Sequence, residues 1–304
     1  MSVPTSTLGR TDVSVTKLGY GAMELRSRRL DGGEVDRLLN SVLDAGINLI
    51  DTSPDYGASE EHIGRAISHR RSEYFLASKC GCPVGESIGE GGPAGREHVF
   101  TRENVRAAVE QSLRRMRTDQ LDLVQFHVSP SPATLAEHDA VGELLALRDE
   151  GKIRFLGISG TLPNLPDQIA MGVFDVYQIP YSAVERDHEG MISAAAQAGG
   201  GTIIRGGVAR GFPEPRTDYP EQYQRMIRER NARYEQTHID DLLEGGSPME
   251  FMLRFTISHP DMHTTIVGTK NPQHLAANIA AASKGPLPAD IYEEAKKRFP
   301  GPTI

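Results

Sequence analysis

The sequence has little cysteine, no tryptophan and no long apolar run. Two cysteines, Cys80 and Cys82, in 304 residues cannot form a disulfide framework, and a C-x-C pair alone is not a set of zinc ligands. The first ten residues lack the apolar stretch of a secretory signal peptide, and no segment approaches the roughly 18 apolar residues of a membrane-spanning helix. We therefore expect a soluble, cytoplasmic protein with no membrane partner.

Basic residues are outnumbered by acidic ones, 33 to 41, which gives a net charge of −8. This balance argues against nucleic acid as a partner. The chain has no P-loop and no H-E-x-x-H or comparable histidine cluster, and Gly19–Glu24 lacks the third glycine of a dinucleotide-binding fingerprint. We therefore expect neither a P-loop nor a Rossmann fold, and no metal.

What the sequence does contain is an alternation of short apolar runs with segments of helical period. The runs predict eight buried parallel strands, at Lys17–Gly21, Ile47–Asp51, Tyr74–Lys79, Asp122–His127, Arg154–Ile158, Asp175–Ile179, Thr202–Arg205 and Thr264–Val267. The amphipathic segments predict helices, at Glu34–Ala45, Arg102–Arg117, Val141–Arg148, Leu162–Met171, Gly190–Ala198, Pro248–Ser258 and Pro272–Ser283. No shift in composition divides the chain, so we expect one domain, residues 1–304, folded as an α/β (β/α)8 TIM barrel.

Some segments lie outside this alternation. Thr5–Leu8 and Val13–Thr16 are separated by turn residues and predict an N-terminal β-hairpin. Two long loops, Gly81–His98 and Gly206–Gly246, follow the third and seventh strands, and Tyr219–Leu243 is expected to be partly helical. Active sites of such barrels form at the C-terminal ends of the strands, so these loops are either pocket walls or surface loops without a role.

Ionisable residues stand at the ends of three successive predicted strands. Asp51 ends the second, Lys79 the third and His127 the fourth, and Tyr56 lies five residues past Asp51. Each residue alone has a structural explanation, such as a helix cap or a rim charge. Together at one end of a barrel they are costly to bury unless they satisfy one another. We therefore expect the four side chains to converge.

Such a set would deliver a proton. An ammonium about 4 Å from the Tyr56 oxygen favours the phenolate by about 4 kcal/mol at an effective dielectric of ~20, before burial reverses part of the effect. Asp51 would hold Lys79 charged, and a neutral His127 would bind a substrate oxygen. This arrangement is suited to protonating a carbonyl oxygen as hydride reaches its carbon, and the hydride requires a reduced nicotinamide.

The segments around these residues are similar to those of the aldo-keto reductase family over nearly the whole chain. The matching stretches are Asn48–Glu61, Ser78–Lys79, Leu121–His127, Gly151–Ser159 and Ile266–Thr269. The resemblance implies an NADPH-dependent reductase of aldehydes or ketones, with Tyr56 as proton donor assisted by Lys79, Asp51 and His127. The family's reducers of carbon–carbon double bonds carry glutamate where His127 stands, so this residue favours carbonyl reduction.

The resemblance further implies that NADPH lies extended across the C-terminal mouth of the barrel. The positions it assigns to the cofactor are Gly21, Met23, Asp51, Ser159, Gln178, Ile204, Arg205, Gly206, Gly207, Val208, Gly268, Thr269, Lys270, His274 and Asn278. Ser159 and Gln178 match the carboxamide contacts, and Gly268–Lys270 matches the turn that holds the 2′-phosphate. One cation beside a helix N-terminus is suited to that charge.

The sequence also departs from the family's pattern. Gly160 replaces an asparagine, Arg205 stands where many members place a tyrosine against the nicotinamide, and His274 replaces a glutamine. These changes leave the choice between NADPH and NADH open, but they do not touch the four catalytic positions.

Two other functions stay open. One is a nucleotide-sensing interaction module on the same barrel, with little turnover. The other is a metal-dependent hydrolase with Asp51 and His127 as ligands, for which the sequence offers too few convergent histidines and carboxylates. For the reductase we expect a small-molecule carbonyl substrate, small or polar because only 6% of residues are aromatic, and a monomer or weak homo-oligomer.

Overall fold

The computed structural model describes residues 2–84, 97–208, 224–225, 228, 231–232, 234–299 and 301. Eight parallel strands close into a barrel in the order β10-β3-β4-β5-β6-β7-β8-β9. The strands are β3 (Leu18–Gly21), β4 (Leu49–Asp51), β5 (Phe75–Cys80), β6 (Leu121–Phe126), β7 (Ile153–Ser159), β8 (Val176–Pro180), β9 (Gly201–Arg205) and β10 (Thr264–Val267). The predicted barrel is confirmed, and each of the eight predicted runs overlaps one strand.

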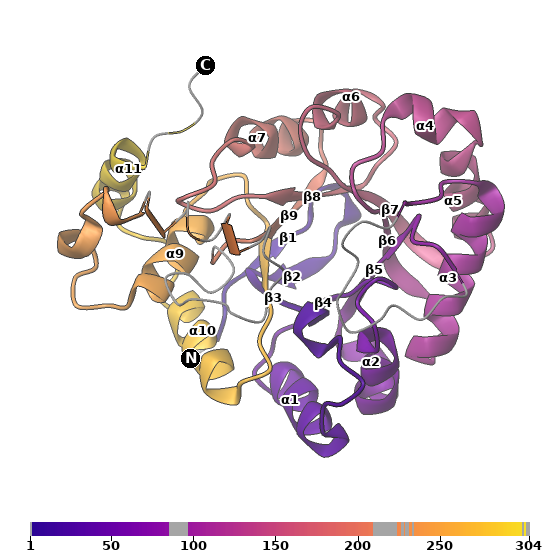
Figure 1. Ribbon diagram of the computed structural model, residues 1–304, viewed down its shortest axis with the longest axis horizontal. Helices are drawn as coiled ribbons and strands as arrows, with labels where there is room; N and C mark the ends of the chain where they lie inside the picture. Colours follow the sequence, from indigo (N-terminus) through magenta and orange to yellow (C-terminus); the bar gives the residue numbers. More distant parts are fainter. Residues whose placement is uncertain are drawn as a thin grey trace.

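Helices surround the barrel (Figure 1). They are α1 (Gly32–Asp44), α2 (Ser59–Ile67), α3 (Arg102–Met116), α4 (Pro132–Glu137), α5 (Ala140–Asp149), α6 (Leu165–Ala170), α7 (Glu189–Gln197), α9 (Pro248–Ile257), α10 (Pro272–Ser283) and α11 (Ala289–Arg298). Four short 3-10 helices are Gly9–Thr11, Ala22–Leu25, Ser68–Glu73 and Ile239–Leu242. Within the described part of the chain, no helix is both long enough and apolar enough to cross a bilayer.

Several expectations about the helices need correction. The sequence analysis did not anticipate α2, α4 or α11, and α6 is shorter than the predicted Leu162–Met171. Only the edges of the loop 81–98 and parts of the loop 206–246 fall within the described residues. The described part of the segment 219–243 is partly helical, as expected, and includes the 3-10 helix Ile239–Leu242.

The predicted N-terminal hairpin is present and seals one end of the barrel. β1 (Thr5–Thr7) pairs antiparallel with β2 (Ser14–Thr16). Leu8 and Val15 of this hairpin pack inside the barrel. Their apolar partners there are Leu49, Phe75, Ala77, Leu123, Val176 and Ile203. The hairpin therefore closes the N-terminal end of the barrel, so the interior of the barrel is open only at the other end.

Neighbouring residues of each strand face the opposite side, as the period of a strand requires. Ile50, Leu76, Val124, Tyr177 and Ile204 belong to the outer core between the barrel and the helices. The apolar residues inside the barrel, which pack against Leu8 and Val15, stand next to these outer-core residues in the sequence and point to the opposite side of the sheet. The barrel thus has two separate apolar cores, one on each side of the sheet.

The inner face changes from apolar to polar along the strands. On five strands a polar residue follows two positions after an apolar inner residue, in the pairs Leu49–Asp51, Ala77–Lys79, Leu123–Gln125, Val176–Gln178 and Ile203–Arg205. The strand register sets Lys79 beside Gln125 and Ser159 beside Gln178. A polar layer therefore lies on the apolar inner core at the C-terminal mouth of the barrel.

The seal formed by the hairpin predicts a stability effect. Leu8 is completely buried, so Leu8→Ala leaves a cavity in the inner core and should lower the free energy of unfolding by about 2–5 kcal/mol. The matched control is Met171→Ala, because Met171 is 36% exposed and should change it by less than about 1 kcal/mol. Chemical denaturation of both variants measures the difference, and equal losses would show that the hairpin does not seal the barrel.

Candidate active site

A buried ion pair lies at the centre of the polar layer. Lys79 Nζ donates to Asp51 Oδ1 at 2.7 Å and to the Thr52 carbonyl at 2.7 Å. Both charged side chains are almost fully buried, 1% and 2% exposed. Asp51 ends β4, whereas Lys79 is the penultimate residue of β5 and His127 directly follows β6, so two of the predicted strand ends were wrong by one residue.

The other carboxylate oxygen of Asp51 binds two glutamines. Gln125 Nε2 and Gln178 Nε2 donate to Oδ2 at 3.0 and 2.9 Å. Gln125 was missed in the sequence analysis, although its place two residues before His127 on the same face of β6 could have indicated it. Gln125 Oε1 is buried and has no hydrogen-bond partner among the described residues. The layer therefore retains acceptor capacity for a bound polar group or solvent.

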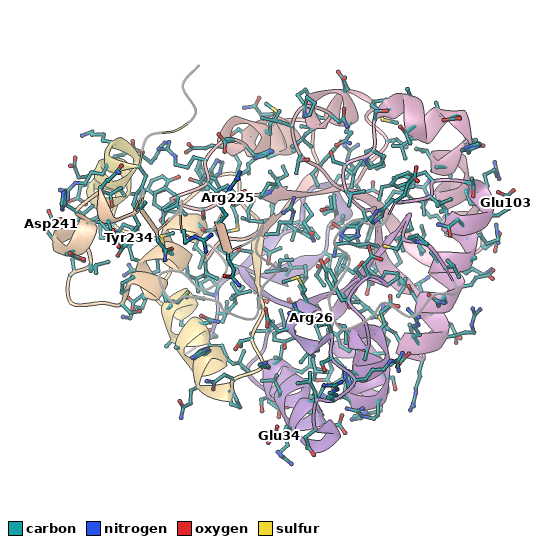
Figure 2. The ribbon with its side chains drawn as sticks, viewed as in Figure 1. Arg26, Glu34, Glu103, Arg225, Tyr234 and Asp241 are labelled. Atoms are coloured by element: carbon teal, nitrogen blue, oxygen red, sulfur yellow. The ribbon has the colours of Figure 1, made fainter. Side chains whose placement is uncertain are left out.

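Tyr56 lies on a tight loop between β4 and α2. Its backbone N–H donates to the Ser53 carbonyl, and the next turn is tied to Arg26, whose carbonyl accepts from Ala58 N at 2.9 Å (Arg26 is labelled in Figure 2). Gly57 has φ +51°, and a Cβ there would lie 2.3 Å from the Arg26 carbonyl oxygen. Only glycine permits this close approach, which holds the Tyr56 ring 5.0 Å from Lys79 Nζ.

The pKa of the Tyr56 phenol is raised above its usual value, mainly by burial. The charges of Lys79 and Arg205 act in the opposite direction, and that of Asp51 adds to the rise. The expectation that Lys79 would lower the phenol pKa was therefore wrong in its net direction, because desolvation outweighs the ammonium. Burial also lowers the pKa of Lys79, but the charges of Asp51 and Tyr56 outweigh it, so that this pKa is raised. At neutral pH both groups carry their protons.

His127 faces Tyr56 edge to face, with ring centroids 6.2 Å apart. Burial lowers the pKa of His127 to about 4 although Asp55 acts to raise it, so the ring is neutral near pH 7. Its Nδ1 lies 3.2 Å from Asp55 Oδ2, 3.3 Å from His98 Nε2 and 3.5 Å from Cys82 Sγ. Burial would raise the pKa of Asp55, but its close polar contacts with His127 and His98 hold it well below its usual value.

Asp55, Cys82 and His98 were not anticipated as members of the site. Asp55 stands next to Tyr56 in the sequence, a position that could have drawn attention to it. Cys82 and His98 stand at opposite ends of one of the long loops, and no short-range spacing connects them. Both cysteines carry free thiols and are buried. The reason given for setting a metal site aside, too few convergent ligands, therefore does not hold around His127.

The predicted carboxamide contacts lie together. Ser159 Oγ donates to Gln178 Oε1 at 3.4 Å, and Gln178 also reaches Asp51. At Gly160, where the resemblance leads one to expect an asparagine, a Cβ would lie 2.6 Å from Leu165 Cδ1 and 2.8 Å from Gln168 Oε1, so a larger residue requires these side chains to shift.

The predicted phosphate turn leads directly into α10. Tyr20 Oη donates to the Thr269 carbonyl at 2.7 Å. A Cβ on Gly268 would lie 2.4 Å from the Gly21 carbonyl oxygen, so a glycine is required where β10 passes β3. Lys270 and His274 are exposed beside the start of α10, and Asn278 is buried on the same helix. A cation beside a helix N-terminus fits an anionic group.

The last residues of β9 and those that follow it differ in how they could contact a cofactor. Arg205 reaches the inner layer, where its charge acts on Tyr56. Among the described residues, no atom lies within 4 Å of where a Cβ on Gly206 would be. Gly207 is fixed by its carbonyl, which accepts from Thr256 Oγ1 at 2.8 Å. The Ile204 and Val208 side chains belong to the outer core, so a cofactor contact there requires their backbone.

On the neighbouring strand β3, which pairs with β10, Gly21 is half-buried at the strand end and Met23 is half-buried in the following turn. The described residues thus bring most of the predicted cofactor positions to one rim.

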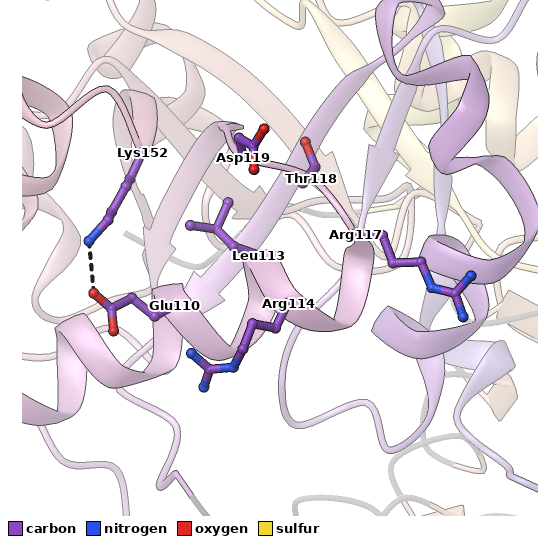
Figure 3. A pocket seen from close by; sticks show the side chains of 7 residues that line it. All are labelled: Glu110, Leu113, Arg114, Arg117, Thr118, Asp119 and Lys152. Atoms are coloured by element: carbon purple, nitrogen blue, oxygen red, sulfur yellow. Dashed lines mark hydrogen bonds and ion pairs between the residues drawn. The ribbon is translucent and has the colours of Figure 1, made fainter.

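A pocket lined by Glu110, Arg114, Thr118, Asp119 and Lys152, among others, lies at the other end of the barrel (Figure 3). It is formed by the end of α3 and the segments that enter β6 and β7. Its lysine is paired with Glu110 at 2.8 Å. None of the residues of the polar layer lines it, so it is separate from the site at the mouth.

Comparison with known proteins agrees with this geometry. The family model described as Aldo/keto reductase family matches residues 17–297. The uncharacterized oxidoreductase YqkF of Bacillus subtilis is 26% identical over 285 residues, which cover 91% of this chain and 90% of that protein. The NADH-specific methylglyoxal reductase of Escherichia coli K12 is 26% identical over 303 residues, which cover 90% of this chain and 92% of that protein.

A solved structure is also similar over nearly its whole length. The aldo-keto reductase AKR11C1 from Bacillus halodurans, in its holo form, superposes with a TM-score of 0.83 at 27% identity. The match covers 99% of this chain and 98% of that one.

The buried ion pair predicts strong coupling between its partners. Lys79→Met leaves the Asp51 carboxylate buried without its counter-charge, and should lower the free energy of unfolding by about 3–5 kcal/mol. Adding Asp51→Asn to this variant removes the uncompensated charge, so the double variant should lose much less than the two single losses added together. A double-mutant cycle measured by chemical denaturation tests this, and additive losses would mean that the two charges are not coupled.

Proposed function

This chain belongs to the aldo-keto reductase family of oxidoreductases, and on that premise we propose that it reduces an aldehyde or ketone to an alcohol with NADPH. The observation that carries the proposal is the convergence of Lys79, Asp51, Tyr56 and His127 at the barrel mouth. Lys79 Nζ is 2.7 Å from Asp51 and 5.0 Å from the Tyr56 ring.

Tyr56 acts as the proton donor. Because burial keeps its pKa high, the phenol holds its proton until a carbonyl oxygen accumulates negative charge. Lys79 then stabilises the phenolate left behind, since its ammonium is held in place by Asp51 and the Thr52 carbonyl. The negative charge that develops on the Tyr56 oxygen lies near the oriented Lys79 ammonium in a site shielded from water. Electrostatic stabilisation is largest in such a site.

His127 positions the substrate oxygen. Its ring is neutral near pH 7, because burial lowers its pKa to about 4. With Nδ1 engaged by Asp55, Cys82 and His98, the remaining ring nitrogen, Nε2, is available to donate a hydrogen bond to the carbonyl oxygen beside Tyr56. For this donation the ring proton must lie on Nε2.

The rim fits a nicotinamide dinucleotide phosphate, which supplies the hydride when bound. Ser159 and Gln178 would hold the carboxamide, Gly206–Val208 the pyrophosphate, and Lys270 with the α10 N-terminus the 2′-phosphate. The open space at Gly206 and the exposed Lys270 support this assignment. We assign the same cofactor role to His274, Asn278, Gly21, Met23 and the backbone of Ile204, and the whole chain to one domain.

A small or polar carbonyl compound is the proposed substrate. Arg205 lies close enough for its charge to act on Tyr56, which favours a substrate with a polar or anionic group. The methylglyoxal reductase of Escherichia coli carries the name of such a small carbonyl compound, and methylglyoxal is therefore a suitable first compound in a screen of aldehydes and ketones.

Replacing the proton donor tests the proposal. Tyr56→Phe should leave NADPH binding within about threefold, because the phenol hydroxyl is not assigned to the cofactor. Carbonyl reduction should fall by about 10²–10⁴-fold, the usual contribution of a general acid. Fluorescence titration measures binding, and NADPH oxidation measures turnover. Unchanged activity in Tyr56→Phe would disprove the assignment, and no turnover by the wild type on any carbonyl would favour the nucleotide-sensing module.

The choice of cofactor is tested at Lys270. Lys270→Gln should weaken NADPH binding by about tenfold and leave NADH binding unchanged, since the lost charge faces only the 2′-phosphate. Lys284→Gln is the control, because Lys284 is an exposed lysine just past the other end of α10, where it pairs with Glu250 at 2.7 Å. Equal effects of Lys270→Gln on both cofactors would contradict this role.

A further inference from the structure

His127 and three side chains behind it bring metal-ligating atoms close together. Asp55, Cys82, His98 and His127 each offer one ligand atom, and these atoms all lie within 4.8 Å of one another. They come from the loop after β4, the segment after β5, the residues before α3 and the end of β6. All four side chains are at most 14% exposed.

Four of the six separations between these atoms are close to the edges of a tetrahedral metal site. Metal–ligand lengths of zinc sites give edges of roughly 3.3 Å between nitrogen or oxygen ligands and roughly 3.6 Å between nitrogen and sulfur. The structure has 3.0 Å from His98 Nε2 to Asp55 Oδ2, 3.2 Å from His127 Nδ1 to the same oxygen, and 3.3 Å between the two nitrogens. Cys82 Sγ is 3.5 Å from His127 Nδ1.

Hydrogen bonds alone cannot satisfy this arrangement. An ionised carboxylate oxygen only accepts, and an imidazole nitrogen either donates or accepts. Asp55 Oδ2, His98 Nε2 and His127 Nδ1 form a triangle of mutual contacts, so at least one side joins two donors or two acceptors. In addition, Asp55 Oδ1 is buried and has no hydrogen-bond partner among the described residues. Solvent hardly reaches this residue, because Asp55 is only 1% exposed. A cation at the centre removes the conflict, because every atom can then offer a lone pair.

We propose that Asp55, Cys82, His98 and His127 form a tetrahedral site for a divalent transition-metal ion, with Zn²⁺ preferred. Imidazole and thiolate ligands select Zn²⁺ over Mg²⁺ or Ca²⁺. Binding forms a metal–sulfur bond as Cys82 loses its thiol proton to solvent. One carboxylate and one thiolate then balance the two positive charges, so the buried site is neutral. Four protein ligands leave no open position, which makes the site structural rather than catalytic.

The site has a consequence for the reaction, and this part rests on the proposed function. A metal on Nδ1 of His127 fixes the ring proton on Nε2, the tautomer that donates to a carbonyl oxygen. The metal would thus position His127 without touching the substrate.

Cobalt binding tests the site without cofactor or substrate, so the result is independent of the proposed function. Chelator-treated full-length protein titrated with Co²⁺ should bind one equivalent, with intense tetrahedral d–d bands and a thiolate-to-cobalt charge-transfer band in the near ultraviolet. One equivalent of Zn²⁺ should remove both. Their absence from the wild-type spectrum would overturn the proposal.

Variants identify the ligands. Cys82→Ser should abolish the charge-transfer band, and His98→Ala should weaken Co²⁺ binding by more than the roughly 10–100-fold that loss of an outer-shell partner costs. Cys80→Ser should keep the band, because Cys80 packs in the outer core, and His138→Ala controls for exposed histidines. Circular dichroism confirms that each variant is folded. A band that survives in folded Cys82→Ser would disprove ligation by this thiol.

Discussion

The ion pair between Lys79 and Asp51 is the interaction on which the site depends. Two charges are removed from water at the end of an apolar barrel interior, a placement that costs several kcal/mol for each ion unless the geometry compensates for it. Here one carboxylate oxygen accepts from Lys79 and the other from Gln125 and Gln178. Each polar partner thereby fixes another, and the ammonium is held 5.0 Å from the Tyr56 ring.

The alternation of the strands explains why such a pair can form at this end. The inner face carries apolar residues near the hairpin and polar residues two positions later. The hairpin closes the apolar end, and the polar layer is left at the mouth, where loops can add Tyr56 and the cluster behind His127. The apolar residues that stabilise the barrel therefore lie at one end of the strands, and the residues of the candidate active site lie at the other end, as is common in barrels of this type.

Much of the fold could be predicted because it depends on local pattern. The eight strands and most helices follow from apolar runs and helical periods, and Asp51, Lys79 and His127 from their positions near strand ends. The helix α2 was not predicted, although Ile63, Ala66 and Ile67 are buried with helical spacing. Ile204 was assigned to the cofactor, although the strand period turns its side chain to the outer core.

Other features depend on distances that the sequence does not contain. Asp55, Cys82 and His98 are far apart in the chain, so only the folded barrel brings them to His127. The direction of the Tyr56 pKa shift was wrong for the same reason, because it is decided by the balance between burial and the ammonium. The space around Gly160 likewise depends on the fold, because Leu165 and Gln168 lie where a larger side chain would extend.

The central claim is that a carbonyl oxygen is bound between the Tyr56 phenol and the His127 ring, above the Lys79–Asp51 pair. A crystal structure of the ternary complex with the oxidised cofactor and an unreactive carbonyl analogue tests it most directly. The account predicts the carbonyl oxygen at about 2.6–3.2 Å from both Tyr56 Oη and His127 Nε2. An analogue whose oxygen binds away from both residues, with the cofactor in place, would contradict it.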